Sequence, residues 1–101
     1  MIDTQERTVT IKLSHLRRIT FAAIATSHGD ISTEELVPRV SVMADKVLGG
    51  NYYVHADYVR RACMWLEKRG LVRSRVGRTR RSVKEMNWTA VQGGGRSIKW
   101  T

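Results

Sequence analysis

Arginine is the residue type whose spacing in this sequence most clearly indicates chemistry. Five arginines stand within nine residues, and two adjacent arginines precede them: Arg73, Arg75, Arg78, Arg80 and Arg81, after Arg60 and Arg61. A guanidinium group is planar and permanently charged, and it can bind a phosphate or the O6 and N7 of guanine with two hydrogen bonds. Side chains crowded in this way repel one another unless an anion lies near. The spacing therefore favours phosphate binding over a merely solvated strand edge.

The positive charge of the chain is strongly one-sided. Residues 1–50 hold six basic and six acidic side chains, whereas residues 51–101 hold 12 basic and three acidic ones. The entire formal net charge of +9 therefore lies in the second half. Such a surface attracts polyanions by Coulomb steering and by release of condensed counterions. A basic composition that served only solubility would be spread along the chain.

Other reactive residue types are sparse. Cys63 is the only cysteine, so an intramolecular disulfide and a cysteine-based zinc site are excluded, and its position predicts a buried, unreactive thiol. The three histidines lie in different predicted elements without ligand spacing. The glycine run 93–95 is not followed by the Lys-Ser/Thr pair of a phosphate loop. We therefore expect no enzyme activity, no cofactor and no metal.

Length predicts one domain, and the single cysteine indicates a reducing, cytoplasmic compartment. The chain of 101 residues has the size of a single domain. Its most apolar stretch, residues 21–25, is far shorter than the roughly 20 residues that a membrane-spanning helix needs. We expect no membrane partner and, in a bacterial or viral source, association with the nucleoid.

The first half of the chain predicts a lead-in and two helices. Residues 1–13 alternate as in a short strand or an extended segment. We expect a first helix from Ser14, its N-cap, to Ser27, stopped by Gly29. Ser32 and Glu35 form a capping-box pattern before a second helix over 33–48, with a kink or restart at Pro38. The apolar stripe of this second helix comprises Leu36, Val40, Met43 and Val47.

A third helix and a hairpin follow. Residues 55–69, closed by Gly70, place one apolar side toward a core, comprising Val59, Ala62, Cys63 and Leu66. Asp57, Arg61, Met64 and Lys68 lie opposite, with Arg60 at the margin. Tyr58 and Trp65 share an edge that could stack on nucleic-acid bases, but we expect it to pack on the hairpin as core or satellite packing. Residues 71–91 predict a β-hairpin with an arginine-rich turn, and residues 92–101 a glycine-rich tail with a short strand.

The junction between the third helix and the hairpin resembles that of winged helix-turn-helix proteins. Leu66-Glu67-Lys68-Arg69-Gly70-Leu71-Val72 is similar to the end of a recognition helix and the start of a wing in that superfamily. Residues 31–36 resemble its short strand and capped second helix, and Trp88-Thr89 its returning wing strand. The resemblance covers about residues 13–91. It implies an α+β, mostly α fold: a three-helix winged helix-turn-helix (helical core 14–70) with a C-terminal β-hairpin wing (71–91).

The resemblance also implies a function, binding of double-stranded DNA in transcriptional control, commonly as a homodimer. Carried over by position, the recognition-helix residues are Arg60, Arg61 and Lys68, with His55 and Asn51 near the helix start and Asp57 flanking the reading face. The wing residues are Arg73, Arg75, Arg78, Arg80 and Arg81. Either arginine of the adjacent pair could instead form an ion pair with Glu67 or Asp57.

Two other functions stay open at this point. The same basic surface could bind RNA by its shape or by its unstacked bases. The fold could also serve as a protein-interaction module or small inhibitor that presents Tyr52, Tyr53 and Trp65 to a partner.

Overall fold

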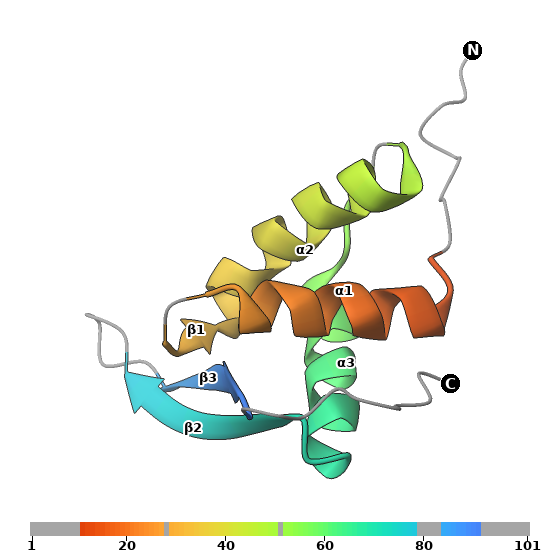
Figure 1. The fold of residues 1–101 in the computed structure, drawn as a ribbon. Coiled ribbons are helices and arrows are strands. Elements are labelled where there is room, and N and C mark those ends of the chain that lie inside the picture. The colour runs from red at the N-terminus through yellow and green to blue at the C-terminus, as the bar shows by residue number, and fades with distance from the viewer. Residues whose placement is uncertain (1–10, 28, 51, 79–83, 92–101) are drawn as a thin grey trace.

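The computed structural model describes residues 11–27, 29–50, 52–78 and 84–91. Three helices and a three-stranded antiparallel sheet make up this part of the chain, which is mostly helical. In chain order they are α1 (Leu13–Ala25), β1 (Ile31–Ser32), α2 (Thr33–Leu48), α3 (Ala56–Lys68), β2 (Val72–Arg78) and β3 (Lys84–Ala90). Figure 1 shows α1 crossing between α2 and the sheet, with α3 descending beside it.

The start of α1 differs from the prediction. The helix begins at Leu13 after Lys12 and not after Ser14, and no described side chain caps its first turn. Its end is capped from within, because the Thr26 hydroxyl donates to the carbonyl of Ala22 (2.9 Å) and the Ser27 hydroxyl donates to that of Ile24 (2.7 Å). These hydroxyls satisfy two carbonyls of the last turn. The helix ends at Ala25, before Gly29.

The second helix begins as the capping box predicts and ends at the predicted residue. The Glu35 backbone N–H donates to the Ser32 hydroxyl oxygen (3.1 Å), and α2 continues through Pro38 to Leu48. Pro38 is the sixth residue of α2, so the helix lacks the hydrogen bond that an N–H at this position would donate to the Glu34 carbonyl. The predicted apolar stripe is wrong at its end, since Val47 is 66% exposed. The next residue, Leu48, packs against the core in its place.

Hydrogen bonds fix the path of the connection between α2 and α3. Asp45 of α2 accepts a hydrogen bond from the backbone N–H of Tyr52, and Ser41 accepts one from the N–H of Val54 (3.1 Å). Val54 is buried among the core residues. The two polar side chains thus hold the connection against α2, which determines where α3 begins.

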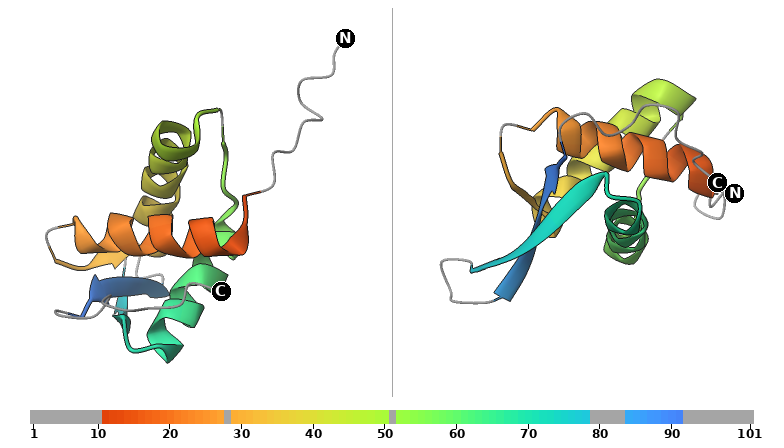
Figure 2. Two further views of the ribbon diagram at one scale, coloured as in Figure 1. Left: turned by 45° about the vertical axis from the view of Figure 1, so that its right-hand side comes forward. Right: turned by 60° about the horizontal axis from the view of Figure 1, so that its bottom comes forward.

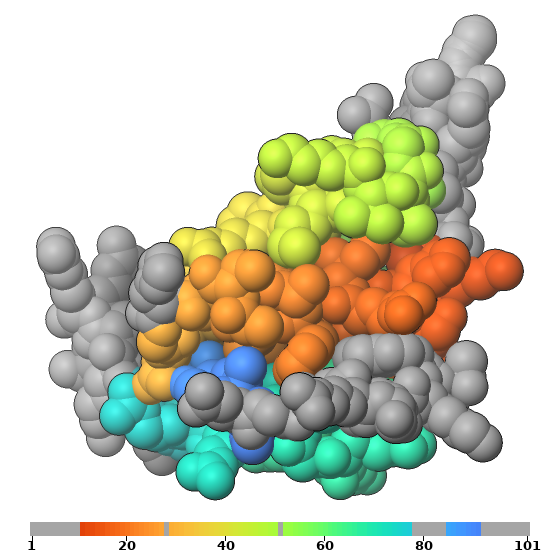
Figure 3. Space-filling model, in the orientation of Figure 1, coloured from red at the N-terminus to blue at the C-terminus, as the bar shows by residue number. Residues whose placement is uncertain are grey.

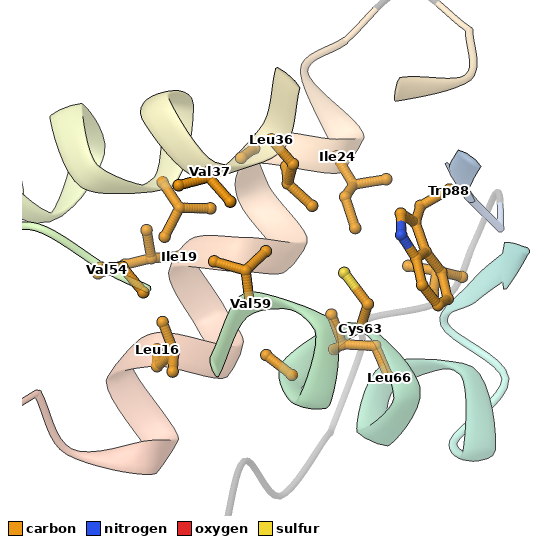
Figure 4. Packing of buried hydrophobic residues seen from close by; sticks show 14 of the residues in the cluster. Leu16, Ile19, Ile24, Leu36, Val37, Val54, Val59, Cys63, Leu66 and Trp88 are labelled. Atoms are coloured by element: carbon orange, nitrogen blue, oxygen red, sulfur yellow. The ribbon is translucent and has the colours of Figure 1, made fainter. Parts of the chain in front are cut away.

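The sheet has the order β1-β3-β2, so the hairpin strand β3 lies in the centre. Ile31 pairs with Trp88, and Val72 pairs with Ala90. Trp88 is 1% exposed, and its indole N–H donates to the Thr33 hydroxyl (2.9 Å) at the start of α2. Figure 4 shows Trp88 at the sheet end of the buried cluster that the three helices share. This one side chain therefore joins the sheet to the helices.

Candidate nucleic-acid interface

Helix α3 is divided into a buried side and an exposed side, as its periodicity predicts. Val59, Ala62, Cys63 and Leu66 are buried, and these residues include the deepest positions of the core. Arg60, Arg61 and Lys68 are exposed. Burial raises the pKa of the Cys63 thiol to about 12, with a further contribution from the negative charge of Glu67. The thiol is therefore protonated at neutral pH and inert, which agrees with its predicted role as a core residue.

The N-terminal end of α3 is a polar cluster. His55 is the N-cap, and its Nδ1 accepts a hydrogen bond from the backbone N–H of Asp57 (3.3 Å). Asp57 Oδ1 lies 2.9 Å from Arg60 Nη1, and its Oδ2 lies 3.9 Å from His55 Nδ1. Of the two alternatives for Arg60, the structure thus supports the ion pair with Asp57. The capping role of His55 was not predicted, because histidine is not a common N-cap residue.

Arg61 lies beside this cluster with its charge uncompensated. With His55, Asp57 and Tyr58 it lines a shallow hollow of about 270 Å³. Within the described segments, neither Arg61 nor Lys68 forms an ion pair with a carboxylate. Tyr58 is 55% exposed, so the expectation that it packs inside the protein is wrong. A cation, a phenol ring and a carboxylate are therefore open to solvent at the same place, a set of groups that can contact base edges or phosphates.

The end of α3 is tightly joined to the hairpin. Gly70 has a φ of 77°, and the N–H groups of Gly70 and Leu71 donate to the carbonyls of Glu67 and Leu66 (both 2.9 Å). This is a Schellman motif, which ends the helix and turns the chain into β2. The Glu67 carboxylate also accepts hydrogen bonds from the backbone N–H (3.2 Å) and the hydroxyl of Ser74. The hairpin therefore starts beside the C-terminal end of α3 and extends to the side (Figure 2).

The hairpin arginines do not all lie on the side of the sheet that faces α3. Successive residues of a strand point to opposite faces, and paired residues of neighbouring strands share a face. Val72 is buried, and Ser74 pairs with the buried Trp88, so these residues define the face toward the helices. Arg73 and Arg75 are exposed and therefore project from the other face.

Arg75 is already engaged on that outer face. Its Nη2 forms an ion pair with Asp30, in the connection between α1 and β1, and Asp30 also accepts a hydrogen bond from the Thr89 hydroxyl of β3. Arg73 lies next to them, around a shallow hollow of about 320 Å³. Of the other predicted wing residues, Arg78 ends β2 in register with Lys84, whereas Arg80 and Arg81 lie outside the described residues, as does Asn51.

A second group of arginines, which the sequence did not indicate, lies on the flank of α3 opposite the one that bonds to the hairpin. The guanidinium carbon of Arg17, on α1, lies 4.3 Å from the ring centroid of Trp65, and that of Arg69 lies 4.6 Å from it. Trp65 thus lies against Arg17 of α1. Helical spacing places Arg17 and Trp65 on the flanks of their helices. It does not indicate that these two helices meet there.

The described residues contain neither a helix that could span a membrane nor a metal-binding group. No helix in segments 11–27, 29–50 and 52–78 is long and apolar enough to cross a membrane. Those segments, with 84–91, also contain no group of three histidine, cysteine or acidic residues that could hold a metal ion. Comparison with family models, curated proteins and solved structures finds no match to this chain, so the argument for function rests on the geometry above.

Proposed function

We propose that this chain is a double-stranded DNA-binding protein with a winged-helix fold, of the kind that regulates transcription, and not an enzyme. In this proposal α3 enters the major groove and the hairpin reaches the neighbouring backbone. The observation that carries it is the exposed side of α3, where Arg61 and Lys68 stand uncompensated on a helix whose other side is fixed in the core. The major groove of B-DNA admits one such helix.

The order of the elements supports this assignment. Helix, short strand, helix, helix and hairpin follow one another, and the short strand β1 joins the hairpin at β3. A winged helix-turn-helix protein, which the sequence resembles at residues 66–72, would need this arrangement. The hairpin that follows the third helix would be its wing.

Electrostatics supports a polyanionic partner. Residues 51–101 contain three acidic side chains, and two of them bind other side chains of the protein. Asp57 pairs with Arg60, and Glu67 accepts from Ser74. Because each of these exposed carboxylates already accepts a hydrogen bond from another side chain of the protein, it repels an approaching phosphate less than an unpaired carboxylate would.

The wing contributes to binding unequally in this proposal. Arg75 is neutralised by Asp30, so we assign the phosphate contacts of the wing to Arg73 and to the residues that follow Gly77. These are Arg78 at the end of β2 and, from the sequence, Arg80 and Arg81.

A salt titration tests the proposal. Fluorescence anisotropy with a labelled duplex should give an affinity that falls steeply with salt, because each phosphate contact adds about 0.9 to the slope of log K against log [salt]. Arg61→Gln should weaken binding, whereas Arg39→Gln, an equal change of charge on the exposed side of α2, should not. No measurable binding to duplex DNA at low salt, or tighter binding to structured RNA at matched salt, would refute the proposal.

One observation favours a protein partner at a different surface. Tyr53 is 80% exposed, and with Val42 and Pro38 it lines a hollow of about 510 Å³ beside α2. The inhibitor hypothesis grouped Trp65 with Tyr53. Trp65 lies on α3, where Arg17 and Arg69 stack on its ring. A second copy of the chain at this α2 surface would give the expected homodimer, and sedimentation equilibrium of wild type against Tyr53→Ser tests it.

A further inference from the structure

One large apolar side chain lies on the exposed side of α3, among the cations that the proposed function uses. Met64 is 50% exposed, whereas the opposite side of the same helix buries Val59 and Leu66 in the core. A single exposed methionine is common on protein surfaces and does not by itself indicate a ligand. Met64 is distinguished by its neighbours on the helix.

Helical spacing surrounds Met64 with the polar side chains of that side. Residues three and four positions apart on a helix are neighbours, so Arg60 and Arg61 precede Met64 by about one turn and Lys68 follows it by about one turn. Arg60 is paired with Asp57, whereas Arg61 and Lys68 form no ion pair with a carboxylate in the described segments. The methionine therefore lies in the middle of a side whose uncompensated charges attract a polyanion.

The rest of the described fold leaves this side of α3 accessible. The opposite side packs on the core, and the flank at Glu67 bonds to Ser74 of β2. Figure 3 shows α3 and β2 next to each other along the lower edge of the molecule, beneath α1. Met64 precedes Glu67 by three positions, so it lies close to the start of the hairpin and is still half-exposed.

The methyl group of thymine is the apolar feature that the major groove offers to such a side chain. Each base pair presents hydrogen-bond donors and acceptors there, and thymine adds a methyl group at C5. A methionine side chain is a poor hydrogen-bond partner for a base edge. It is unbranched and flexible, so it packs well against apolar atoms. Its chemistry therefore matches a methyl group and not a polar base edge.

The spacing between Arg61 and Met64 matches neighbouring base pairs. Three residues of an α-helix rise about 4.5 Å, and successive base pairs are about 3.4 Å apart. An arginine in the major groove most often binds guanine, through O6 and N7. When Arg61 contacts a guanine in this way, Met64 reaches the adjacent base pair.

We propose that Met64 is a specificity-determining residue that reads the C5 methyl group of a thymine, in the base pair adjacent to the one that Arg61 contacts. The inference rests on the proposed function, and it adds a base preference that the phosphate contacts do not give. Those contacts hold the helix on any sequence. The apolar contact with Met64 forms only where a methyl group stands in the groove.

Deoxyuridine tests this directly, because it differs from thymidine only by the absence of the C5 methyl group. A duplex is selected from a randomised pool with wild-type protein, and its thymines are then replaced by deoxyuridine one at a time. For wild type, one replacement should weaken binding roughly fourfold at 0.1 M salt, which corresponds to the burial of one methylene-sized group. The slope of log K against log [salt] should not change, because no phosphate contact is lost.

Variants at position 64 show whether this side chain reads the methyl group. Met64→Ala should bind the thymine duplex roughly fourfold more weakly than wild type and should not distinguish thymine from uracil. We expect it to fold, since the side chain is exposed and alanine is the better helix former. Met64→Leu keeps an apolar side chain and should retain part of the discrimination. Val47→Ala, which shortens an exposed apolar side chain of α2, is the control and should match wild type.

The failure of this inference differs from the failure of the proposed function. If wild type binds duplex DNA but selects no thymine, tolerates every replacement, or discriminates no better than Met64→Ala loses to uracil, the role of Met64 is refuted and the proposed function stands. Discrimination by Met64→Ala equal to that of wild type refutes it too. If wild type does not bind duplex DNA at all, both fail.

Discussion

Helix α3 and strand β2 carry the same type of side chain, but the fold places the arginines of each differently. On α3, Arg61 is exposed beside a tyrosine without an ion pair among the described residues, and Arg69, the residue after α3, stacks on an indole ring. On β2, Arg75 points to the outer face of the sheet and is bound by Asp30. The number of arginines in a segment therefore does not give its electrostatic contribution. The face on which each arginine lies, and what it meets there, decides that contribution.

The period of the element explains the difference. In a helix the residues opposite the core share one side, whereas a strand divides its residues between two faces. The density of the five arginines of residues 73–81 in the sequence therefore does not show that all of them serve one surface. Of the described members, Arg73 and Arg75 belong to the face that points away from the helices.

The largest effect should come from disrupting the packing between the hairpin and the helices. Trp88 joins the hairpin to the helices, and Trp88→Ala removes its packing and its hydrogen bond to Thr33. We expect a loss of about 3–5 kcal/mol in the free energy of unfolding, measured by urea denaturation. Trp88→Phe, which keeps most of the volume, should lose less. A loss below about 1 kcal/mol for the alanine variant would mean that the indole does not hold the sheet on the helices.

The second prediction compares the two regions directly. Arg61→Gln should cost about 1–3 kcal/mol on a duplex selected from a randomised pool, because a base contact is lost. Arg75→Gln should cost much less, since the charge it removes is already paired with Asp30. Anisotropy on the selected duplex and on a scrambled one measures both affinity and preference. An equal or greater loss for Arg75→Gln would reverse the proposed ranking of α3 and β2.

A third change should free an arginine of β2 to contact DNA, as is proposed for Arg61 of α3. Asp30→Asn removes the carboxylate that neutralises Arg75, and the amide oxygen still accepts from the Thr89 hydroxyl. Arg75 then becomes available to phosphate, so the slope of log K against log [salt] should steepen by up to about 0.9 for any duplex. Glu34→Gln, the same charge change on the exposed surface of α2, serves as the control. Identical slopes for the two variants would show that Arg75 lies too far from the bound DNA.

The smallest effect concerns Thr20 of α1, which belongs to neither α3 nor β2. The Thr20 hydroxyl of α1 is buried and has no hydrogen-bond partner among the described residues. Thr20→Val replaces it with a methyl group of similar volume and should raise the free energy of unfolding by up to about 1 kcal/mol. DNA binding should not change, which separates stability from affinity. Destabilisation of more than about 1 kcal/mol would indicate that the hydroxyl has a partner after all.

Sequence reasoning succeeded where the physics is local. The Ser32 cap, the extent of α2, the buried side of α3 and the presence of the hairpin all depend on residues close together in the chain, and the structure confirms each. The predicted start of α1 was wrong: the helix begins at Leu13, with Lys12 and not Ser14 at the N-cap position and without a side-chain cap.

The contacts that decide the electrostatics are not local. Asp30 meets Arg75, and Arg17 meets Trp65, only because α1 and its connection pack against the hairpin and α3. Nothing in the spacing of these residues indicates that they pair. Val47 and Tyr58 follow the apolar or aromatic pattern of their helices, yet they are exposed because no other described element covers them.

The most direct test of the DNA-binding role of α3 is a map of the bound surface. Amide chemical shifts of labelled protein, recorded during titration with a short duplex, should change most over 55–69 and in β2, and least at the exposed residues of α2 from Arg39 to Val47. Shifts confined to α2 and Tyr53, with those of α3 unchanged, would contradict the account.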